Sequence, residues 1–493
     1  MLSRPFGSDN DATMPNTKID RIFNKRFLTQ GVFLLMGGTA FGQILSVLFS
    51  PLLSRLYLPV DFGLLAFYTA IITVIGSIAS MSYHQAIPLP ACEDDAVPIL
   101  IAAIGFILAT VGVVSIVLLF FSNQILGFLD GSKLRPFVWM VPLGILGLAL
   151  YETCTQWAIR SKAFGVIALT STTKALGQTG TQIGMGFLST GACGLLAGQL
   201  VGQWVGVGRL AGISLKSIYK VGRPLKWDAV AEALREYRRF PAFATPTAML
   251  NTLSTNAPPI LLTVFFGGAT AGLYAFGQRV VMLPISMVAK SYSQVFLSTA
   301  ADDYRKGILS EKVGAVVHRL LSGALPVAAL FAIVAPEAFA AIFGEEWRKA
   351  GVYSSWLCPW MLLVLLAMPI SPLVAVLQKQ KAGLIFQIVL LVSRAGAIFI
   401  GGLAKNAELA IGLFAVSGII CWGTYWLWLL HISKALKPLL QKMKTAHFVE
   451  NVLCVLSLAA VKFLTTNAMV LCVFSLLLIL LSLYLAYFRK ESK

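Results

Sequence analysis

The chain has 493 residues, of which 57% are hydrophobic and only 12% are charged. Soluble globular proteins carry about 25% charged residues, so the composition excludes a soluble globular protein and indicates a chain that lies mostly in lipid. The net charge of +18 does not indicate a nucleic-acid partner. The basic residues lie between long apolar runs, where they set membrane orientation and contact anionic lipid headgroups.

A polar tail with a basic end, 1–26, precedes the first apolar run. A helix needs about 20 mostly apolar residues to cross a bilayer, and this criterion predicts about fourteen transmembrane helices. Their approximate ranges are 30–53, 63–88, 97–121, 136–158, 164–188, 191–213, 242–266, 268–297, 314–343, 351–377, 382–402, 407–432, 448–465 and 467–488. We therefore predict an all-α polytopic membrane protein.

The connections between these runs predict the orientation of the chain. With the N-terminus in the cytoplasm, about 28 of the 39 Lys and Arg residues fall in cytoplasmic connections and about seven in outer ones. Such an excess of positive charge is typical of the cytoplasmic side. It predicts a multi-pass protein of the bacterial inner (cytoplasmic) membrane with both termini in the cytoplasm.

The longest connection, 215–240, is too short to be a catalytic domain. Its segment 227–239 has apolar residues at helical spacing and ends in Arg235, Arg238 and Arg239. This pattern predicts an amphipathic helix on the inner leaflet, in contact with anionic lipids. An ordinary solvated linker helix is the alternative.

A short repeat predicts how the helices are grouped. The second span begins Phe62-Gly-Leu-Leu-Ala-Phe67 and the eighth begins Ala271-Gly-Leu-Tyr-Ala-Phe276. The two matching segments occur in pairs of spans that have similar lengths, and both segments start on the same side of the membrane in the predicted topology. Repeats of this kind are common in transporters. We predict two parallel six-helix lobes, 27–214 and 241–433, around a central cavity, with two extra helices and a cytoplasmic C-terminus in 434–493.

Four basic residues lie inside apolar spans: Lys174, Arg279, Lys290 and Arg394. A charge at the bilayer centre costs roughly 2.5–3.5 kcal/mol even on a lenient scale, so these side chains should face a hydrated cavity or a partner. Their excess over acidic residues predicts a cationic cavity that binds an anionic substrate. The alternatives are pairing with a carboxylate and snorkelling to the interface, the latter above all for Lys290.

Uncharged polar residues share helix faces with these cations or lie on neighbouring spans. Thr247, Asn251 and Thr255 recur at four-residue intervals in the seventh span, which places them on one face. The amides predicted to line the cavity are Gln43, Gln178, Asn251, Gln278 and Gln294. Hydrogen bonding between helices inside the bundle is the alternative.

The sequence contains none of the catalytic signatures HExxH, GxSxG or Walker A. Seven cysteines, none in a CxxC pair, predict neither a disulfide nor a metal site. We therefore predict a protein that is not an enzyme and has no cofactor. Glu152, one of few acidic residues inside a span, is the best candidate for coupling transport to H⁺ or Na⁺.

Three segments carry a family resemblance: 55–63 (RLYLPVDFG), 237–241 (YRRFP) and 271–280 (AGLYAFGQRV). They resemble the polysaccharide (O-antigen and lipopolysaccharide) flippases of the multidrug/oligosaccharidyl-lipid/polysaccharide (MOP) exporter superfamily. The resemblance covers the first twelve spans. Arg279 is the only one of the four cations inside a matching segment.

The resemblance implies two six-helix lobes that open alternately to each side of the membrane. It implies as cargo an undecaprenyl-pyrophosphate-linked oligosaccharide, flipped to the outer leaflet for surface polysaccharide synthesis. A polysaccharide polymerase and a chain-length regulator are the protein partners to expect. A pyrophosphate is anionic and suits charge-assisted hydrogen bonds from Arg or Lys.

Three alternatives remain at this stage. A flippase for the peptidoglycan lipid precursor has similar chemistry and also fourteen spans. A cation-coupled multidrug exporter of the same superfamily would require an acidic cavity. A membrane glycosyltransferase or polymerase would require a large outer loop or an acidic catalytic motif, and the sequence contains neither.

Overall fold

The computed structural model describes residues 37–38, 40–90, 92–128, 132–221, 227–377, 379–442 and 478. Within these residues it contains helices and no strand, which confirms the all-α prediction. Seven described segments are long and apolar enough to cross a membrane, and one of them, 240–293, covers two predicted spans. The last two predicted spans, 448–465 and 467–488, lie outside the described residues.

The helices that correspond to the predicted spans follow their order in the chain. Those of the first half are α2 (Ser50–Leu56), α3 (Pro59–Ala79), α4 (Glu93–Phe128), α5 (Met140–Arg160), α6 (Phe164–Phe187) and α7 (Ala192–Val221). Those of the second half are α9 (Thr245–Arg305), α10 (Leu309–Phe343), α11 (Arg348–Ala367), α13 (Gln380–Leu403) and α14 (Ala407–Ile432). Short elements connect them: η1 (Tyr83–Ala86), η2 (Ser132–Phe137), α8 (Trp227–Glu236), η3 (Phe240–Ala244), η4 (Glu345–Trp347), η5 (Met368–Ile370), α12 (Leu373–Val376) and α15 (Leu436–Lys442).

Local chemistry explains where several helices begin and end. Pro59 opens α3, and the Asp61 carboxylate accepts a hydrogen bond from the Leu58 backbone N–H (3.0 Å), as expected for a helix N-terminus. The second span was predicted to cover 63–88, but the helix observed there, α3, ends at Ala79. Gly267 interrupts α9 with φ of 80°, which favours glycine, and this divides α9 into the predicted seventh and eighth spans.

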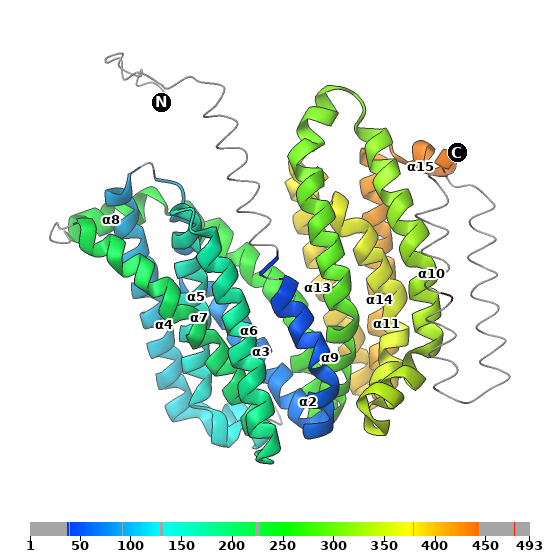
Figure 1. Ribbon diagram of the computed structural model, residues 1–493, viewed down its shortest axis with the longest axis horizontal. Helices are drawn as coiled ribbons and strands as arrows, with labels where there is room; N and C mark the ends of the chain where they lie inside the picture. Colours follow the sequence, from blue (N-terminus) through cyan, green and yellow to red (C-terminus); the bar gives the residue numbers. More distant parts are fainter. Residues whose placement is uncertain are drawn as a thin grey trace.

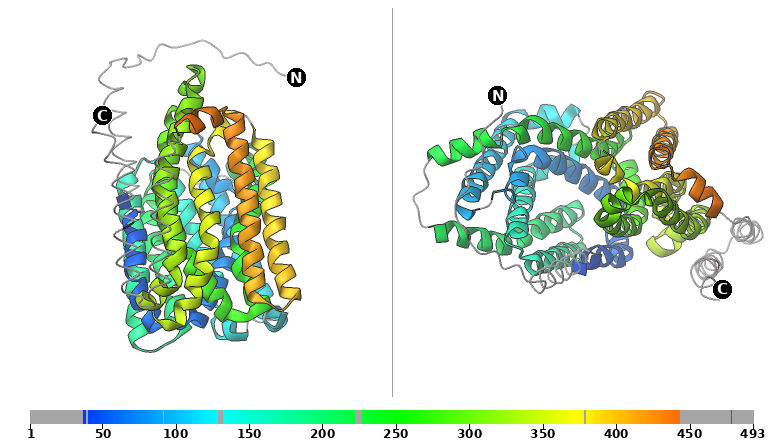
Figure 2. Two further views of the ribbon diagram at one scale, coloured as in Figure 1. Left: turned by 90° about the vertical axis from the view of Figure 1, so that its right-hand side faces the viewer. Right: turned by 90° about the horizontal axis from the view of Figure 1, so that it is seen from above.

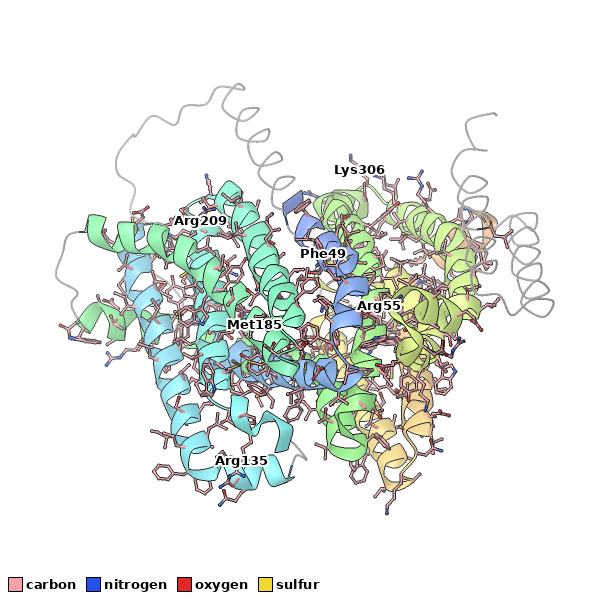
Figure 3. The ribbon with its side chains drawn as sticks, turned by 60° about the horizontal axis from the view of Figure 1, so that its bottom comes forward. Phe49, Arg55, Arg135, Met185, Arg209 and Lys306 are labelled. Atoms are coloured by element: carbon pink, nitrogen blue, oxygen red, sulfur yellow. The ribbon has the colours of Figure 1, made fainter. Side chains whose placement is uncertain are left out.

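The helices form two groups that diverge toward one end of the molecule (Figures 1 and 2). One group contains α3–α7 and the other contains α10–α14. We call the end that carries α8, η1 and α15 the α8 side, and the opposite end, with the Gly267 kink and η4, the Gly267 side. Figure 3 labels Lys306 in the α9–α10 turn on the α8 side and Arg135 on the Gly267 side. The predicted amphipathic helix is observed as α8.

On the Gly267 side the two groups are in contact along α3 and α9. A Cβ atom at Gly63 would overlap the carbonyl oxygen of Gly268, and one at Gly272 would overlap that of Pro59. The backbones therefore touch at a seam that only glycine permits. Next to it, the Phe62 ring packs edge-on against Phe276, with ring centroids 5.1 Å apart.

Hydrogen bonds close the same side of the molecule. The indole N–H of Trp347 donates to the Ser54 carbonyl (3.1 Å), and the Ser54 hydroxyl donates to the Phe343 carbonyl (3.1 Å). On the α8 side, α9 begins against the first group, where the Thr245 hydroxyl donates to that of Ser82 (2.9 Å). The helix then crosses to the second group (Figure 1). The structure is thus closed on the Gly267 side.

Candidate functional site

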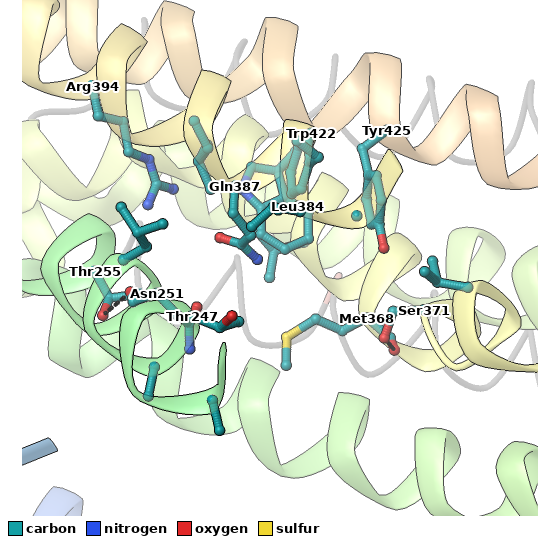
Figure 4. A pocket seen from close by; sticks show the side chains of 18 of the residues that line it. Thr247, Asn251, Thr255, Met368, Ser371, Leu384, Gln387, Arg394, Trp422 and Tyr425 are labelled. Carbon is teal, nitrogen blue, oxygen red and sulfur yellow. Dashed lines mark hydrogen bonds between the residues drawn. The ribbon is translucent and has the colours of Figure 1, made fainter. Parts of the chain in front are cut away.

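A cavity of about 1240 Å³ lies between α9 and the helices α11, α13 and α14, and it reaches Gln85 of η1 on the α8 side. It exceeds the usual range of small-molecule pockets, roughly 300–1,000 Å³. The polar and aromatic residues that line it are Gln85, Arg239, Phe240, Phe243, Thr247, Asn251, Thr255, Gln278, Trp360, Ser371, Lys381, Phe386, Gln387, Arg394, Trp422 and Tyr425. Figure 4 shows much of this lining.

The lining carries positive charge without a compensating carboxylate. Arg239, Lys381 and Arg394 are its cations, and none of its described residues is Asp or Glu. Arg239 and Lys381 are exposed at the α8 side, whereas Arg394 is only 5% exposed. The remaining polar groups are amides and hydroxyls, and six aromatic side chains complete the wall. Such a surface suits an anionic ligand that also carries many hydroxyl groups.

Helical periodicity places these side chains on the cavity wall. Lys381, Leu384, Gln387 and Arg394 of α13 recur at intervals of three or seven residues and all line the cavity, which places them within about 140° of the circumference of the helix. On α9 the predicted polar face of Thr247, Asn251 and Thr255 lines the opposite wall (Figure 4).

Arg394 is enclosed by aromatic rings. Its guanidinium carbon lies 4.7 Å from the centroid of the Trp360 ring and 5.3 Å from that of Phe414. Cation–π contacts are strongest at desolvated sites such as this one. The buried Nε has no hydrogen-bond partner, and no ion pair to Arg394 occurs among the described residues. The charge is therefore held in place without being neutralised.

Three of the residues predicted from the sequence meet in this cavity: Arg394, Asn251 and Gln278. Arg279 follows Gln278 on α9 but does not line it. It is seven residues from Gly272, which places it on the helix face directed toward α3, about 10 Å from the seam along α9. Arg279 is half-buried, and no hydrogen bond or ion pair to it occurs in the described part of the chain.

Lys174 and Glu152 lie in the first group, away from the cavity. The Lys174 ammonium lies 4.4 Å from the centroid of the Tyr151 ring. No salt bridge within 4.0 Å between Lys174 and Glu152 occurs among the described residues. Both side chains are half-buried. The structure therefore separates this predicted cation from Arg394.

The other predicted residues are dispersed. The Gln178 amide donates to that of Gln199 (2.7 Å) and joins α6 to α7, as the interhelical alternative predicts. Gln43 is half-buried on the helix that precedes α2, and Lys290 is exposed on α9. The side chain of Gln294 lies outside the described residues.

Sequence reasoning missed several lining residues. Lys381 lies one residue outside the predicted span 382–402. Thirteen residues separate it from Arg394, which places the two about 140° apart around a helix, so helical spacing does not pair them. Arg239 belongs to the basic segment 227–239, whose pattern predicts contact with anionic lipids rather than with a cavity. Trp422 and Tyr425 gave no signal, because aromatic residues in apolar runs are also typical of lipid interfaces and cores.

The architecture is shared with solved transporters. The chain is similar to a lipid II flippase MurJ in an inward closed conformation, with a TM-score of 0.69 and 15% identity, over 94% of this chain and 100% of that one. It is also similar to an inward-facing multidrug resistance MATE family transporter of the MOP superfamily (TM-score 0.53, 14% identity, 82% and 95%). At these identities the likeness establishes the fold.

A third similar structure is a MOP superfamily transporter from Pyrococcus furiosus, described as having a binding pocket of reverse polarity. Its TM-score is 0.52 at 14% identity, over 83% of this chain and 96% of that one. No curated protein matches the sequence.

Residues 52–351 match the family described as "Polysaccharide biosynthesis protein". The match covers more than half of the chain and includes the seam and Arg279. This protein therefore belongs to the polysaccharide biosynthesis protein family and is a multi-pass membrane protein with the MOP transporter fold.

Proposed function

We propose that this protein flips a polyprenyl-pyrophosphate-linked oligosaccharide from the cytoplasmic to the outer leaflet of the inner membrane, for the synthesis of a cell-surface polysaccharide. The observation that carries the proposal is the cavity, whose described lining combines three cations with amides and aromatic rings and contains no carboxylate. Membership in a polysaccharide biosynthesis family supports the same conclusion.

The chemistry of the cargo suits this lining. A pyrophosphate needs charge-assisted hydrogen bonds, which Arg and Lys supply. Sugar hydroxyls need donors and acceptors, which the amides of Asn251, Gln278 and Gln387 offer. The flat apolar faces of sugar rings can pack on aromatic rings such as Trp422 and Tyr425.

Transport would proceed by alternating access. The excess of positive charge favours a cytoplasmic location for the α8 side, so that the closed Gly267 side would face outward in this state. The head of the cargo enters from the α8 side while its prenyl chain stays in lipid. The seam between Gly63 and Gly272 then opens. Arg279, about 10 Å from the seam, would bind the pyrophosphate as it moves toward the outer side.

The energy source is a separate part of the proposal. Glu152 of α5 and Lys174 of α6 are both half-buried in the first group, and Glu152 is our candidate for coupling to H⁺ or Na⁺. A polysaccharide polymerase and a chain-length regulator would receive the flipped product.

A peptidoglycan lipid precursor is a second candidate cargo, because the MurJ structure to which this chain is similar is described as a lipid II flippase. Cationic drugs are not favoured as cargo, because the described cavity lining is basic and contains no carboxylate.

The test is the sidedness of lipid-linked oligosaccharides in a deletion strain. We expect complete repeat units on the cytoplasmic leaflet, rescued by the wild-type gene but not by Arg279→Ala at equal expression. Arg209→Ala, at a cation outside the cavity and the seam, is the matched control and should rescue. Normal delivery to the outer leaflet in the deletion strain would refute the flippase proposal. Trapped peptidoglycan precursor would identify the second cargo instead.

A further inference from the structure

The cations of the cavity are separated along α13. Lys381 lies in the first turn of this helix and Arg394 thirteen residues later, which corresponds to about 20 Å along the axis. Arg239 lies with Lys381 at the α8 side. The cavity thus has two positive regions, an exposed one at its mouth and a buried one at its depth.

A single pyrophosphate cannot satisfy both regions, because its two phosphorus atoms are bridged by one oxygen and span far less than this separation. In this state, before the seam opens, the prenyl chain lies in the cytoplasmic leaflet and keeps the attached pyrophosphate near headgroup level. The pyrophosphate therefore meets Arg239 and Lys381 at the mouth. The group that reaches Arg394 is the saccharide.

The surroundings of Arg394 indicate which chemical group it receives. Trp360 and Phe414 cover the faces of the guanidinium, and its Nε is buried. The terminal N–H groups of Arg394 donate to no described residue. Unlike Nε, they are not among the buried atoms that lack a partner, so they are available to a ligand in the cavity. Figure 4 shows the guanidinium directed from α13 toward Thr255 and Asn251 of α9.

Such a planar pair of donors in a nearly dry site matches an oxyanion held through two parallel hydrogen bonds. A neutral hydroxyl would leave the buried charge uncompensated. We propose that the oligosaccharide carries an acidic sugar, a uronate, and that Arg394 binds its carboxylate in the depth of the cavity. This inference rests on the proposed function and adds the substrate class and the residue that selects it.

Binding to the purified full-length chain in nanodiscs tests the inference, with three probes measured by calorimetry. The probes are cellobiouronate (an acidic disaccharide), cellobiose (its neutral counterpart) and geranyl pyrophosphate. We expect cellobiouronate to bind about 10- to 100-fold more tightly than cellobiose, the range expected for a hydrogen bond to a charged group. Arg394→Gln should abolish this preference and leave geranyl pyrophosphate binding unchanged.

Two matched variants complete the design. Lys381→Gln, at the mouth, should weaken geranyl pyrophosphate and leave the preference for the uronate. Lys437→Gln, which removes an exposed charge on α15, should change neither. Arg394→Lys keeps the charge and should retain part of the preference, which guards against a folding defect in Arg394→Gln.

The outcomes separate the two proposals. Equal affinity for both disaccharides, with geranyl pyrophosphate still bound, would overturn the acidic-sugar inference and leave the flippase proposal intact. Loss of geranyl pyrophosphate rather than uronate binding in Arg394→Gln would assign Arg394 to the pyrophosphate and likewise overturn it. Failure of all three probes to bind wild-type protein would count against both proposals.

Discussion

Aromatic rings hold the buried charge of Arg394 in the structure. Phe414 is 1% exposed and contacts the guanidinium, the Tyr274 ring and the Trp360 ring. Replacing it by Leu removes a desolvated cation–π contact and leaves a small cavity. We predict that Phe414→Leu lowers the stability by about 1–3 kcal/mol.

Thermal unfolding in detergent, followed by circular dichroism, measures this change. Phe120→Leu is the matched control, because the Phe120 ring is 74% exposed on α4 and its loss should leave the melting temperature nearly unchanged. Equal melting temperatures for Phe414→Leu and wild type would show that the ring does not support Arg394.

His84 lies in η1, outside the spans, and its Nδ1 is 2.5 Å from the Ser80 hydroxyl oxygen. Burial lowers the pKa of His84 from its ordinary value of 6.5 to about 4. The folded protein therefore binds this proton less readily than the unfolded chain. The stability contributed by neutral His84 is complete above pH 6.5 and is lost as the pH falls toward 4.

We therefore predict that the melting temperature falls more steeply between pH 6.5 and 4.5 in wild type than in His84→Asn. Ser80→Ala serves as the control, since it removes the hydrogen bond but keeps the titrating ring, and so should retain the pH dependence. The same slope in wild type and His84→Asn would contradict the burial of a neutral imidazole.

At the scale of residues, the sequence predicts best the charged side chains inside membrane spans, because their burial in lipid is energetically unfavourable. Arg394 could be predicted as a cavity residue because a charge inside a span requires a hydrated cavity or a partner. Gln178 was placed in the cavity and makes an interhelical hydrogen bond instead, because helical spacing defines a face but not what that face contacts. Trp360 was missed because an aromatic residue has the same sequence signature in a core, at lipid or at a cavity.

At the scale of elements, the two copies of the sequence repeat pack against each other. Gly63 and Gly272 occupy equivalent positions in 62–67 and 271–276. A Cβ at Gly63 would meet the Gly268 carbonyl, and a Cβ at Gly272 would meet that of Pro59, four residues earlier in each repeat. The repeat therefore forms a pseudo-symmetric seam, and its glycines are required for backbone contact.

We predict that Gly272→Ala opens the Gly267 side. A methyl group there cannot fit against the Pro59 carbonyl unless α3 and α9 separate. Spin labels at Thr190 and Lys405, exposed on the two groups, should report a longer distance in Gly272→Ala than in the parent, after replacement of the seven native cysteines. Gly412→Ala is the control, because a Cβ there meets nothing within 4 Å, and it should leave the distance unchanged. An unchanged distance in Gly272→Ala would contradict the role of the seam in closing the Gly267 side.

The boundaries of elements were less predictable than their number. Hydropathy located the spans but extended the second to residue 88, past the end of α3 at Ala79 and through the short helix η1. It also treated 351–377 as one helix, although α11 ends at Ala367 and is followed by η5 and α12. Backbone turns of this kind depend on tertiary packing, which hydropathy does not describe.

At the scale of the whole molecule, orientation determines which side receives the cargo. Positive charge predicts that Lys306, in the α9–α10 turn, is cytoplasmic and that Lys405, in the α13–α14 turn, faces outward. Alkaline phosphatase fused after Lys405 should therefore be active and after Lys306 inactive, whereas a green fluorescent protein fusion should show the reverse. Activity after Lys306 would invert the proposed direction of transport.

The arrangement of the lobes was only partly accessible from the sequence. The repeat predicted two parallel halves. Their contact on one side and their divergence on the other depend on the seam and on Trp347, whose tertiary contacts cannot be read from a sequence pattern. The boundaries 27–214 and 241–433 stay predictions. The structure adds that α9 begins against the first group, through Thr245 and Ser82, before it joins the second.

The most direct test of the central claim is lipid flipping by the purified protein in proteoliposomes. A polyprenyl-pyrophosphate-linked oligosaccharide would be incorporated, and its exposure on the outer surface followed over time with an added glycosidase that cannot cross the membrane. We predict that wild-type protein makes nearly all of the oligosaccharide accessible, whereas Arg279→Ala and protein-free liposomes leave about half protected. If wild-type protein also leaves half protected under an imposed ion gradient, the protein is not a flippase for this class of lipid.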